Sequence, residues 1–182
     1  RVHRLQRVYV SFGTAIWIHY RDQALAALEA IARAASQRRL QAVISLGGAA
    51  LEGAVTAGLH QPGVAVREYA DQAAELAAAD LFITHHGLNS THEAVNAATP
   101  MLSHPFFFDQ PFLARRCQAL GLAMPLRDGQ DGPLTAAAAD AALTAAEAQL
   151  PQLVDRLHTA RQWELEVMGQ RDTVVDRVLA LG

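Results

Sequence analysis

The segment Ile83–Glu93, with the sequence ITHHGLNSTHE, brings three histidines and a glutamate together. Imidazoles and carboxylates at close spacing can bind a metal ion, whereas imidazole N–H groups beside a glycine can bind an anion. His85 and His86 are adjacent in a segment expected to be extended, so their side chains should point to opposite faces. His92 lies beyond the expected turn, and the spacing matches no HExxH or Cys/His pattern. We therefore expect no metal site.

The same segment has the features of an anion site at the start of a helix. Gly87 allows the backbone to turn, and Ser90 and Glu93 have the S-x-x-E spacing of a capping box, which predicts a helix beginning near Thr91. Free N–H groups at a helix start attract phosphate, and Ser90 and a neighbouring histidine can donate further hydrogen bonds. A purely structural interpretation stays open, in which Ser90 and Glu93 only cap the helix.

Short β-branched runs alternate with Ala- and Leu-rich helical stretches, a pattern typical of βαβ units around a parallel sheet. The clearest helix covers residues 22–35, with an apolar stripe on one face. Ligands of such sheets bind beyond the carboxyl ends of the strands, so the loop after the predicted strand 81–84 is a candidate site. The predicted strands cover residues 8–12, 42–46, 64–67, 81–84, 101–103 and 122–125.

The chain of 182 residues, about half of them apolar, suits one compact domain. We predict an α/β fold: a Rossmann-like three-layer domain with a mostly parallel sheet of about six strands within residues 8–126. A polar loop over 127–133 then leads into a helical tail over 134–182. Pro151 is predicted to break this tail into helices over 136–149 and 152–168, with Gly169 as a C-cap before a last helix near 173–180.

The composition excludes several classes of function. All fifteen basic residues are arginines, and the net charge of -3 includes no long run of one sign, which argues against a surface for nucleic acid or acidic membranes. The single Cys117 excludes an internal disulfide and favours a reducing, cytoplasmic setting. No apolar stretch predicts a membrane span or a signal peptide. The first strand follows Arg1 almost at once, which suggests a fragment of a longer polypeptide.

Several ordered blocks resemble a known family. They are YADQ at 69–72, ADLFITHHGLNSTHEA at 79–94, TPM at 99–101 and DQP at 109–111, and VSFGT at 10–14 is a further match. Over about residues 8–126 these blocks resemble the carboxyl-terminal donor-binding domain of UDP-glycosyltransferases, glycosyltransferase family 1, and of its macrolide-type members in particular. The resemblance implies one half of a GT-B fold, with the amino-terminal acceptor domain absent from this chain.

The resemblance assigns the diphosphate contacts to the histidine-rich segment and to the first strand. It implies that His85 donates to the diphosphate, that Gly87, Leu88 and Asn89 supply backbone contacts, and that Ser90 supplies a hydroxyl contact. Thr14 is similar to a small hydroxyl residue that approaches the diphosphate in the family; otherwise it is a turn residue that caps its own backbone.

The resemblance also implies where the rest of the donor is bound. Glu93 would accept hydrogen bonds from the ribose hydroxyls. Tyr69 stands where plant members commonly have a tryptophan stacked on the uracil, with the backbone of Ala70 reading the base edge and Gln72 retained. Asp109 and Gln110 would hold hydroxyls of the sugar. Plain packing for Tyr69 and a helix N-cap for Asp109 stay open as alternatives.

The activity that the resemblance implies is inverting transfer of a glucose-like sugar from a UDP-sugar, or a dTDP-sugar, to a small-molecule acceptor, such as a bacterial natural product, without metal or other cofactor. The family's general base lies in the absent half, so we predict no catalytic residue here. The 182 residues alone should bind UDP weakly and transfer no sugar. A non-catalytic nucleotide-sugar-binding module and a GT-B epimerase stay open as alternatives, and His86, His92 and His104 receive no role.

Overall fold

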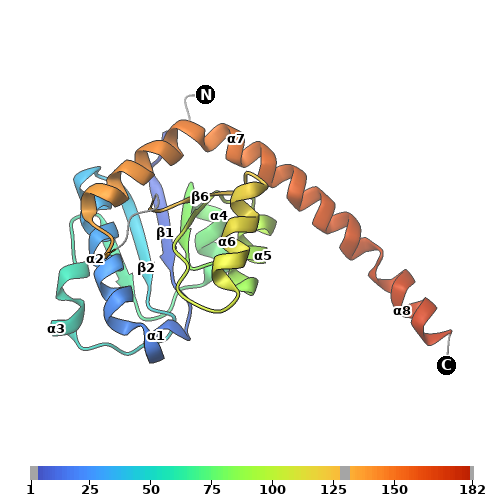
Figure 1. Cartoon of the computed structure of the whole chain (residues 1–182), viewed down its shortest axis with the longest axis horizontal. Coiled ribbons are helices and arrows are strands. Elements are labelled where there is room, and N and C mark those ends of the chain that lie inside the picture. Colours follow the sequence, from blue (N-terminus) through green and yellow to red (C-terminus); the bar gives the residue numbers. More distant parts are fainter. Residues whose placement is uncertain (1–3, 128–131, 181–182) are drawn as a thin grey trace.

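A single parallel sheet of six strands forms the centre of the protein (Figure 1). The computed structural model describes residues 4–127 and 132–180. The strand order is β3-β2-β1-β4-β5-β6, and all five neighbouring pairs are parallel. The predicted α/β fold and the six predicted strands are confirmed, with each strand boundary shifted by at most one residue. The strands are β1 Arg7–Ser11, β2 Gln41–Ser45, β3 Val64–Arg67, β4 Leu81–Thr84, β5 Met101–Ser103 and β6 Ala123–Pro125.

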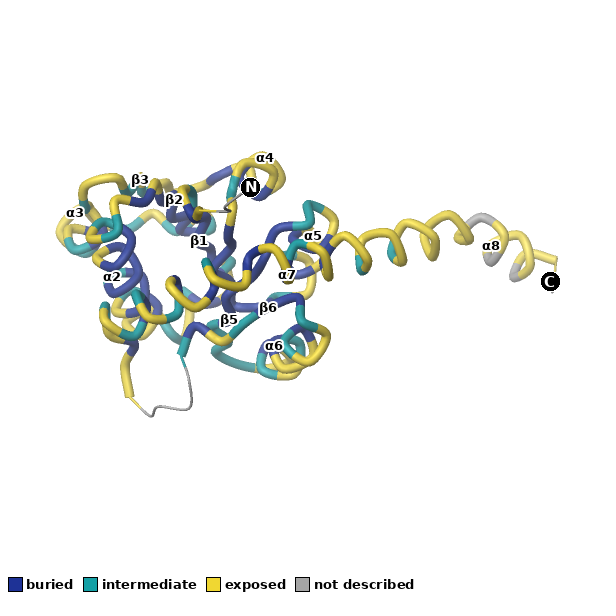
Figure 2. The backbone as a smooth tube through the Cα atoms, turned by 90° about the horizontal axis from the view of Figure 1, so that it is seen from above, coloured by how far each residue is buried: buried dark blue, intermediate teal, exposed yellow. Residues whose placement is uncertain are grey.

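Helices cover both faces of this sheet, because the central strands are apolar on both sides and bury both faces. On one face the core includes α2 and the first half of α7, and on the other it includes α4, α5 and α6. In Figure 2 the strands are mostly buried, whereas the helices are buried only where they face the sheet and exposed on their outer turns. The helices are α1 Ile16–His19, α2 Arg21–Gln37, α3 Gly53–Thr56, the 3-10 helix η1 Ala57–Leu59, α4 Gln72–Ala78, α5 Leu88–Ala97, α6 Gln110–Ala119, α7 Ala136–Gly169 and α8 Arg171–Leu179.

The predicted break at Pro151 is wrong. α7 is continuous from Ala136 to Gly169 with Pro151 inside it, and it arches over the domain before its second half and α8 extend away from the body (Figure 1). Buried leucines on both sides of the proline, Leu150, Leu153 and Leu157, hold the two halves in one helix. The predicted C-cap is also displaced, because Gln170 is the C-cap and α8 begins at Arg171. The predicted polar loop 127–133 lies partly outside the described residues.

None of the helices in the described ranges is both long enough and apolar enough to cross a membrane.

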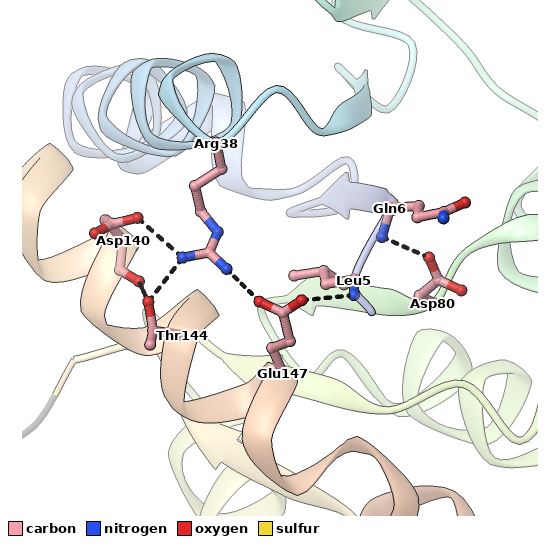
Figure 3. A network of polar contacts seen from close by, with 7 residues as sticks. All are labelled: Leu5, Gln6, Arg38, Asp80, Asp140, Thr144 and Glu147. Atoms are coloured by element: carbon pink, nitrogen blue, oxygen red, sulfur yellow. Dashed lines mark hydrogen bonds and ion pairs between the residues drawn. The ribbon is translucent and has the colours of Figure 1, made fainter. Parts of the chain in front are cut away.

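A polar network joins α2 and the start of β1 to the first half of α7 (Figure 3). Arg38, at the end of α2, donates from Nη1 to Thr144 Oγ1 at 2.7 Å and to Asp140 Oδ1 at 3.3 Å, and from Nη2 to Glu147 Oε2. The other oxygen of Glu147 accepts from the backbone N–H of Leu5 at 3.0 Å. One guanidinium thus fixes where α7 crosses the amino-terminal end of the sheet.

Replacing Arg38 with methionine should therefore lower the free energy of unfolding by about 1–3 kcal/mol, because Glu147 and Asp140 lose their partner at a half-buried junction. Urea denaturation followed by circular dichroism measures this change. The matched control is Arg33→Met, which removes an exposed i,i+4 pair with Glu29 and should cost no more than about 0.5 kcal/mol. Equal losses in the two variants would contradict a special role for Arg38.

Candidate functional site

The strand order reverses between β1 and β4, which are neighbours although β2 and β3 separate them in the chain. Such a reversal leaves a crevice at the carboxyl ends of the strands, where open α/β sheets bind ligands. A cavity of about 530 Å³ lies there. It is lined by Tyr9, Ser11, Gly13, Thr14, Ala15, Ser45, Gly47, Tyr69, Ala70, Gln72, His85, Gly87, Leu88, Asn89, Ser90 and Glu93. Ten of the twelve predicted site residues are among them.

Three neighbouring strands end in the same way at this cavity. The last residue of each strand carries a hydroxyl that accepts a hydrogen bond from the backbone N–H two residues later. The pairs are Gly13 to Ser11 at 3.3 Å, Gly47 to Ser45 at 3.3 Å and His86 to Thr84 at 3.1 Å. These local bonds turn the chain as it leaves the sheet and fix the loops that form the cavity wall.

His85 lies between two glycines. A Cβ added at Gly87 would stand 2.5 Å from His85 Nε2, and one added at Gly13 would stand 2.8 Å from it, so the ring fills the space that the missing side chains leave. His85 is 9% exposed, and its Nδ1 has no hydrogen-bond partner among the described residues. Burial lowers the pKa of His85 to about 4, although the Ser11 backbone and Asp109 favour the charged form. His85 is therefore a neutral imidazole at pH 7.

Helix α5 begins earlier than predicted, and the predicted capping box does not form. Gly87, in an extended conformation, is the N-cap, and the first intrahelical bond runs from Thr91 N–H to Gly87 O at 2.9 Å. Ser90 and Glu93 thus lie inside the helix, and no side chain caps it. The first N–H groups of a helix have no intrahelical partner, so those of Leu88, Asn89 and Ser90 are available at the cavity.

Glu93 and Ser90 are joined by an amide from another helix. Gln72 is the first residue of α4, which Asp71 caps by accepting from Ala74 N–H at 3.2 Å. Its Nε2 donates to Ser90 Oγ at 3.2 Å and to Glu93 Oε2 at 2.6 Å. The Glu93 carboxylate, together with the Ser90 hydroxyl and the Gln72 amide, therefore lies about one helical turn from the free amides of α5.

Tyr69, Ala70 and Thr14 lie at the rim of the same cavity. Tyr69 is 76% exposed, and its ring stacks on no other ring among the described residues, so the packing alternative is not what the structure shows. The backbone of Ala70 follows it with the methyl group buried. An exposed aromatic ring at a cavity rim can bind a flat ligand on its face.

Asp109 and Gln110 do not line the cavity. Gln110 is 5% exposed, and its Oε1 accepts from the backbone N–H groups of Phe106 at 2.9 Å and Phe107 at 3.2 Å, which ties the loop before α6. Asp109 occupies the N-cap position of α6, but its side chain accepts no capping bond. The exposed Asp109 is close enough to His85 to favour protonation of that ring.

The other histidines lie in separate places. His86 is fully buried, with its ring between Thr91 Oγ1 at 3.3 Å and Ser103 Oγ at 2.8 Å. His92 is exposed, and its ring pairs with Glu164 of α7 at 2.9 Å. His104 packs against the rings of Phe12 and Phe106. Within residues 4–127 and 132–180, no three His, Cys, Asp or Glu side chains are arranged to hold a metal ion.

Sequence reasoning missed six cavity residues: Tyr9, Ser11, Gly13, Ala15, Ser45 and Gly47. A signal for four of them was present, because the first two strands lead into S-x-G, as Ser-Phe-Gly at 11–13 and Ser-Leu-Gly at 45–47. Tyr9 gave no such signal, since it alternates within β1 like an ordinary core residue.

Known proteins that are similar to this chain include glycosyltransferases. The model of the family "UDP-glucoronosyl and UDP-glucosyl transferase" matches residues 60–145, which include α4, α5 and the loop between β4 and α5. Residues 60–145 form part of a UDP-glycosyltransferase-type domain. A curated relative, the zeaxanthin glucosyltransferase of Pantoea ananas, is 49% identical over 51 residues, which are 28% of this chain and 12% of the relative.

Solved structures of glycosyltransferases have the same fold over more than nine tenths of the chain. The calicheamicin glycosyltransferase CalG4 superposes with a TM-score of 0.74 at 22% identity and covers 98% of this chain and 45% of its own. A UDP-glucose:anthocyanidin 3-O-glucosyltransferase in complex with UDP superposes with a TM-score of 0.72 at 22% identity and covers 91% of this chain and 37% of its own. These structures confirm the GT-B-type fold, and the chain spans less than half of their length.

Proposed function

We propose that this chain binds the nucleoside diphosphate of a UDP-sugar in the cavity between β1, β4 and α5, as the donor-binding half of a glycosyltransferase. The observation that carries the proposal is the convergence on one cavity of the free amides of α5, His85 and the Gln72–Glu93 pair. The family match over residues 60–145 includes these elements except β1.

The diphosphate is assigned to the start of α5. The amides of Leu88, Asn89 and Ser90 and the positive end of the helix dipole attract an anion. Among the described residues that line the cavity there is no arginine, so neutral donors carry the interaction. His85 adds one N–H and Thr14 adds a hydroxyl from the loop after β1. As the sugar departs, negative charge develops on the diphosphate, and fixed donors of this kind stabilise it.

The nucleoside is assigned to the side of the cavity that α4 forms. Glu93 accepts hydrogen bonds only, which suits the ribose hydroxyls, and it lies on α5 next to the amides that hold the diphosphate. Tyr69 offers an exposed ring to the uracil, with the backbone of Ala70 and the Gln72 side chain beside it. Asp109 and Gln110 are assigned to the sugar. For Gln110 only the amide nitrogen is free for this, since Oε1 binds the loop backbone.

The reaction we propose is displacement at the anomeric carbon, with inversion, by an acceptor deprotonated by a base outside these residues. The acceptor is a small apolar molecule bound by an amino-terminal domain that this chain does not contain. The names of two similar proteins, a zeaxanthin glucosyltransferase and a calicheamicin glycosyltransferase, support an acceptor of this kind. We propose a cytoplasmic enzyme that needs no metal, and a donor sugar that is glucose-like.

Calorimetric titration tests the nucleotide assignment. We expect the purified chain to bind UDP and UDP-glucose more tightly than dTDP, since dTDP lacks the 2′-hydroxyl that would donate a hydrogen bond to Glu93. Glu93→Ala should weaken UDP binding about tenfold, the usual value of a hydrogen bond to a charged group, and should leave dTDP binding less changed. Glu166→Ala, at an exposed position on α7, is the control.

Equal binding of UDP and dTDP, together with no effect of Glu93→Ala, would contradict the ribose assignment. Incubating the 182-residue chain with UDP-glucose and an apolar acceptor should give no glycoside, because the proposed base is outside it. Turnover by the chain alone would overturn that part of the proposal. A non-catalytic binding module predicts UDP binding as well, but then the full-length protein would also transfer no sugar.

A further inference from the structure

We propose that Tyr9 is a positioning residue for the ribose site: its buried hydroxyl orients the side-chain amide of Gln72, and this amide holds Glu93 ready to accept from the ribose. The inference rests on the proposed function, since it explains how the residue assigned to the ribose is held.

Tyr9 is fixed before any ligand binds. It lies in the middle of β1, next to the centre of the sheet, and is 1% exposed. Its ring stacks on that of Phe82, its register partner on β4, with the centroids 5.1 Å apart and the planes 13° from parallel. Ser11, two residues later, points to the same face of the sheet. The Tyr9 hydroxyl therefore lies where the apolar core ends and the floor of the cavity begins.

The hydroxyl faces polar groups that link it to the cavity. It lies 3.5 Å from Gln72 Oε1 and donates to that oxygen. Burial raises the pKa of Tyr9, although the Ser11 and Ser45 hydroxyls favour the ionised form. The hydroxyl thus keeps its proton and can donate at neutral pH.

The Gln72 side-chain amide has an NH2 group that donates and a carbonyl oxygen that accepts, so its neighbours select one of its two orientations. Glu93 only accepts hydrogen bonds, so the NH2 group of Gln72 must face it, and Nε2 lies 2.6 Å from Glu93 Oε2. The carbonyl oxygen then faces the sheet, where it needs a donor, and Tyr9 supplies one. In the opposite orientation, the amide oxygen would lie against the Glu93 carboxylate and repel it. A donor at Tyr9 and an acceptor at Glu93 therefore select the same orientation.

This chain of contacts restricts an otherwise free side chain. Glu93 is on an exposed part of α5, where a glutamate has several rotamers and loses entropy on binding. The Gln72 amide engages Oε2, while Oε1 has no hydrogen bond with any described residue and stays available to a hydroxyl. Holding the carboxylate before the ligand arrives lowers the cost of binding.

The test compares UDP with 2′,3′-dideoxyuridine diphosphate, which lacks the ribose hydroxyls. We expect the wild-type chain to bind UDP more tightly, and Tyr9→Phe to reduce the ratio of the two affinities about threefold, in line with the loss of one weak hydrogen bond. UDP binding should weaken, whereas dideoxy-UDP binding should not change. A merely structural role would weaken both ligands equally. Tyr20→Phe, whose ring packs on Phe106 and Phe107 outside the cavity, should leave the ratio unchanged.

A second variant keeps the test decisive if Tyr9→Phe does not fold. Gln72→Met retains the length of the side chain but has no amide, and it should lower the same ratio at least as much. In the double variant the two effects should not add, because they act through one contact. An unchanged ratio in a folded variant that still binds UDP overturns the inference alone. No UDP binding by the wild-type chain overturns the proposed function, and the inference with it.

Discussion

Replacing Gly47 with alanine should lower the affinity for UDP more than tenfold. Gly47 follows β2 with φ at +61°, and a Cβ there would lie 2.3 Å from the carbonyl oxygen of Gly13 and 2.8 Å from its carbon. These are backbone atoms, so the clash cannot be relieved by turning a side chain. The loop after β1 must move instead, and this loop carries Thr14 and borders His85. A displacement of that wall disturbs the diphosphate site.

Gly48→Ala is a matched control for this prediction. Gly48 also has a positive φ, at +86°, but a Cβ there meets no atom within 4 Å. Both variants should lose about 1 kcal/mol of stability from the left-handed backbone alone. Only Gly47→Ala should also lose UDP affinity in calorimetric titration. If both variants bound UDP equally well, the contact between Gly47 and Gly13 would not support the site.

The sheet could be predicted from the sequence because each strand is a short apolar run buried on both faces. The strand Leu81–Thr84 shows this, since all four residues are buried. The order of the strands could not be read from these runs, because pairing depends on contacts between distant segments. The same limit explains the error at Pro151. A proline inside a helix costs about 3 kcal/mol locally. Leu150 before the proline and Leu153 and Leu157 after it are buried, and their burial offsets that cost. These contacts join segments far apart in the chain, so the local sequence around Pro151 does not predict them.

The candidate site was predicted largely from the segment Ile83–Glu93, whose residues have the features of an anion site and resemble a glycosyltransferase motif. The sequence did not predict the local conformation of this segment. Ser90 and Glu93 have the spacing of a cap, but Gly87 takes the N-cap position, so α5 starts at Leu88 and both side chains are free to meet Gln72. That contact joins residues 18 and 21 positions apart, and sequence alone gives no reason to pair them.

The protein should lose stability in acid because several of its histidines are buried. We expect the free energy of unfolding to fall steeply between pH 6.5 and about pH 4. Burial lowers the pKa of His85, His86 and His104 from 6.5 to about 4, with further lowering from His85 at His86 and from Arg127 at His104. In the unfolded chain the pKa of these rings returns to its ordinary value, so at mildly acidic pH they bind protons that they do not bind in the folded chain.

This difference in proton binding makes the folded protein less stable as the pH falls. Above pH 6.5 the rings are neutral in both states, so the full stability is present. As the pH falls towards 4, the unfolded state binds more protons and stability is lost. A fall in pKa from 6.5 to about 4 corresponds to about 3 kcal/mol for the fully buried ring of His86, and to less for the partly exposed His104. Since a domain of this size is stable by about 5–15 kcal/mol, the protein should lose a large part of its stability by pH 4.

Urea denaturation at several pH values between 4.5 and 7.5 measures this dependence. His104→Phe should make the slope shallower by about one proton, because it removes one titrating ring, and phenylalanine can keep the contacts with Phe12 and Phe106. His158→Gln, which removes an exposed histidine on α7, should leave the slope unchanged. A wild-type stability that does not change over this range would mean that the buried histidines take up protons in the folded protein. In that case His85 would meet the diphosphate as a cation rather than as a neutral donor.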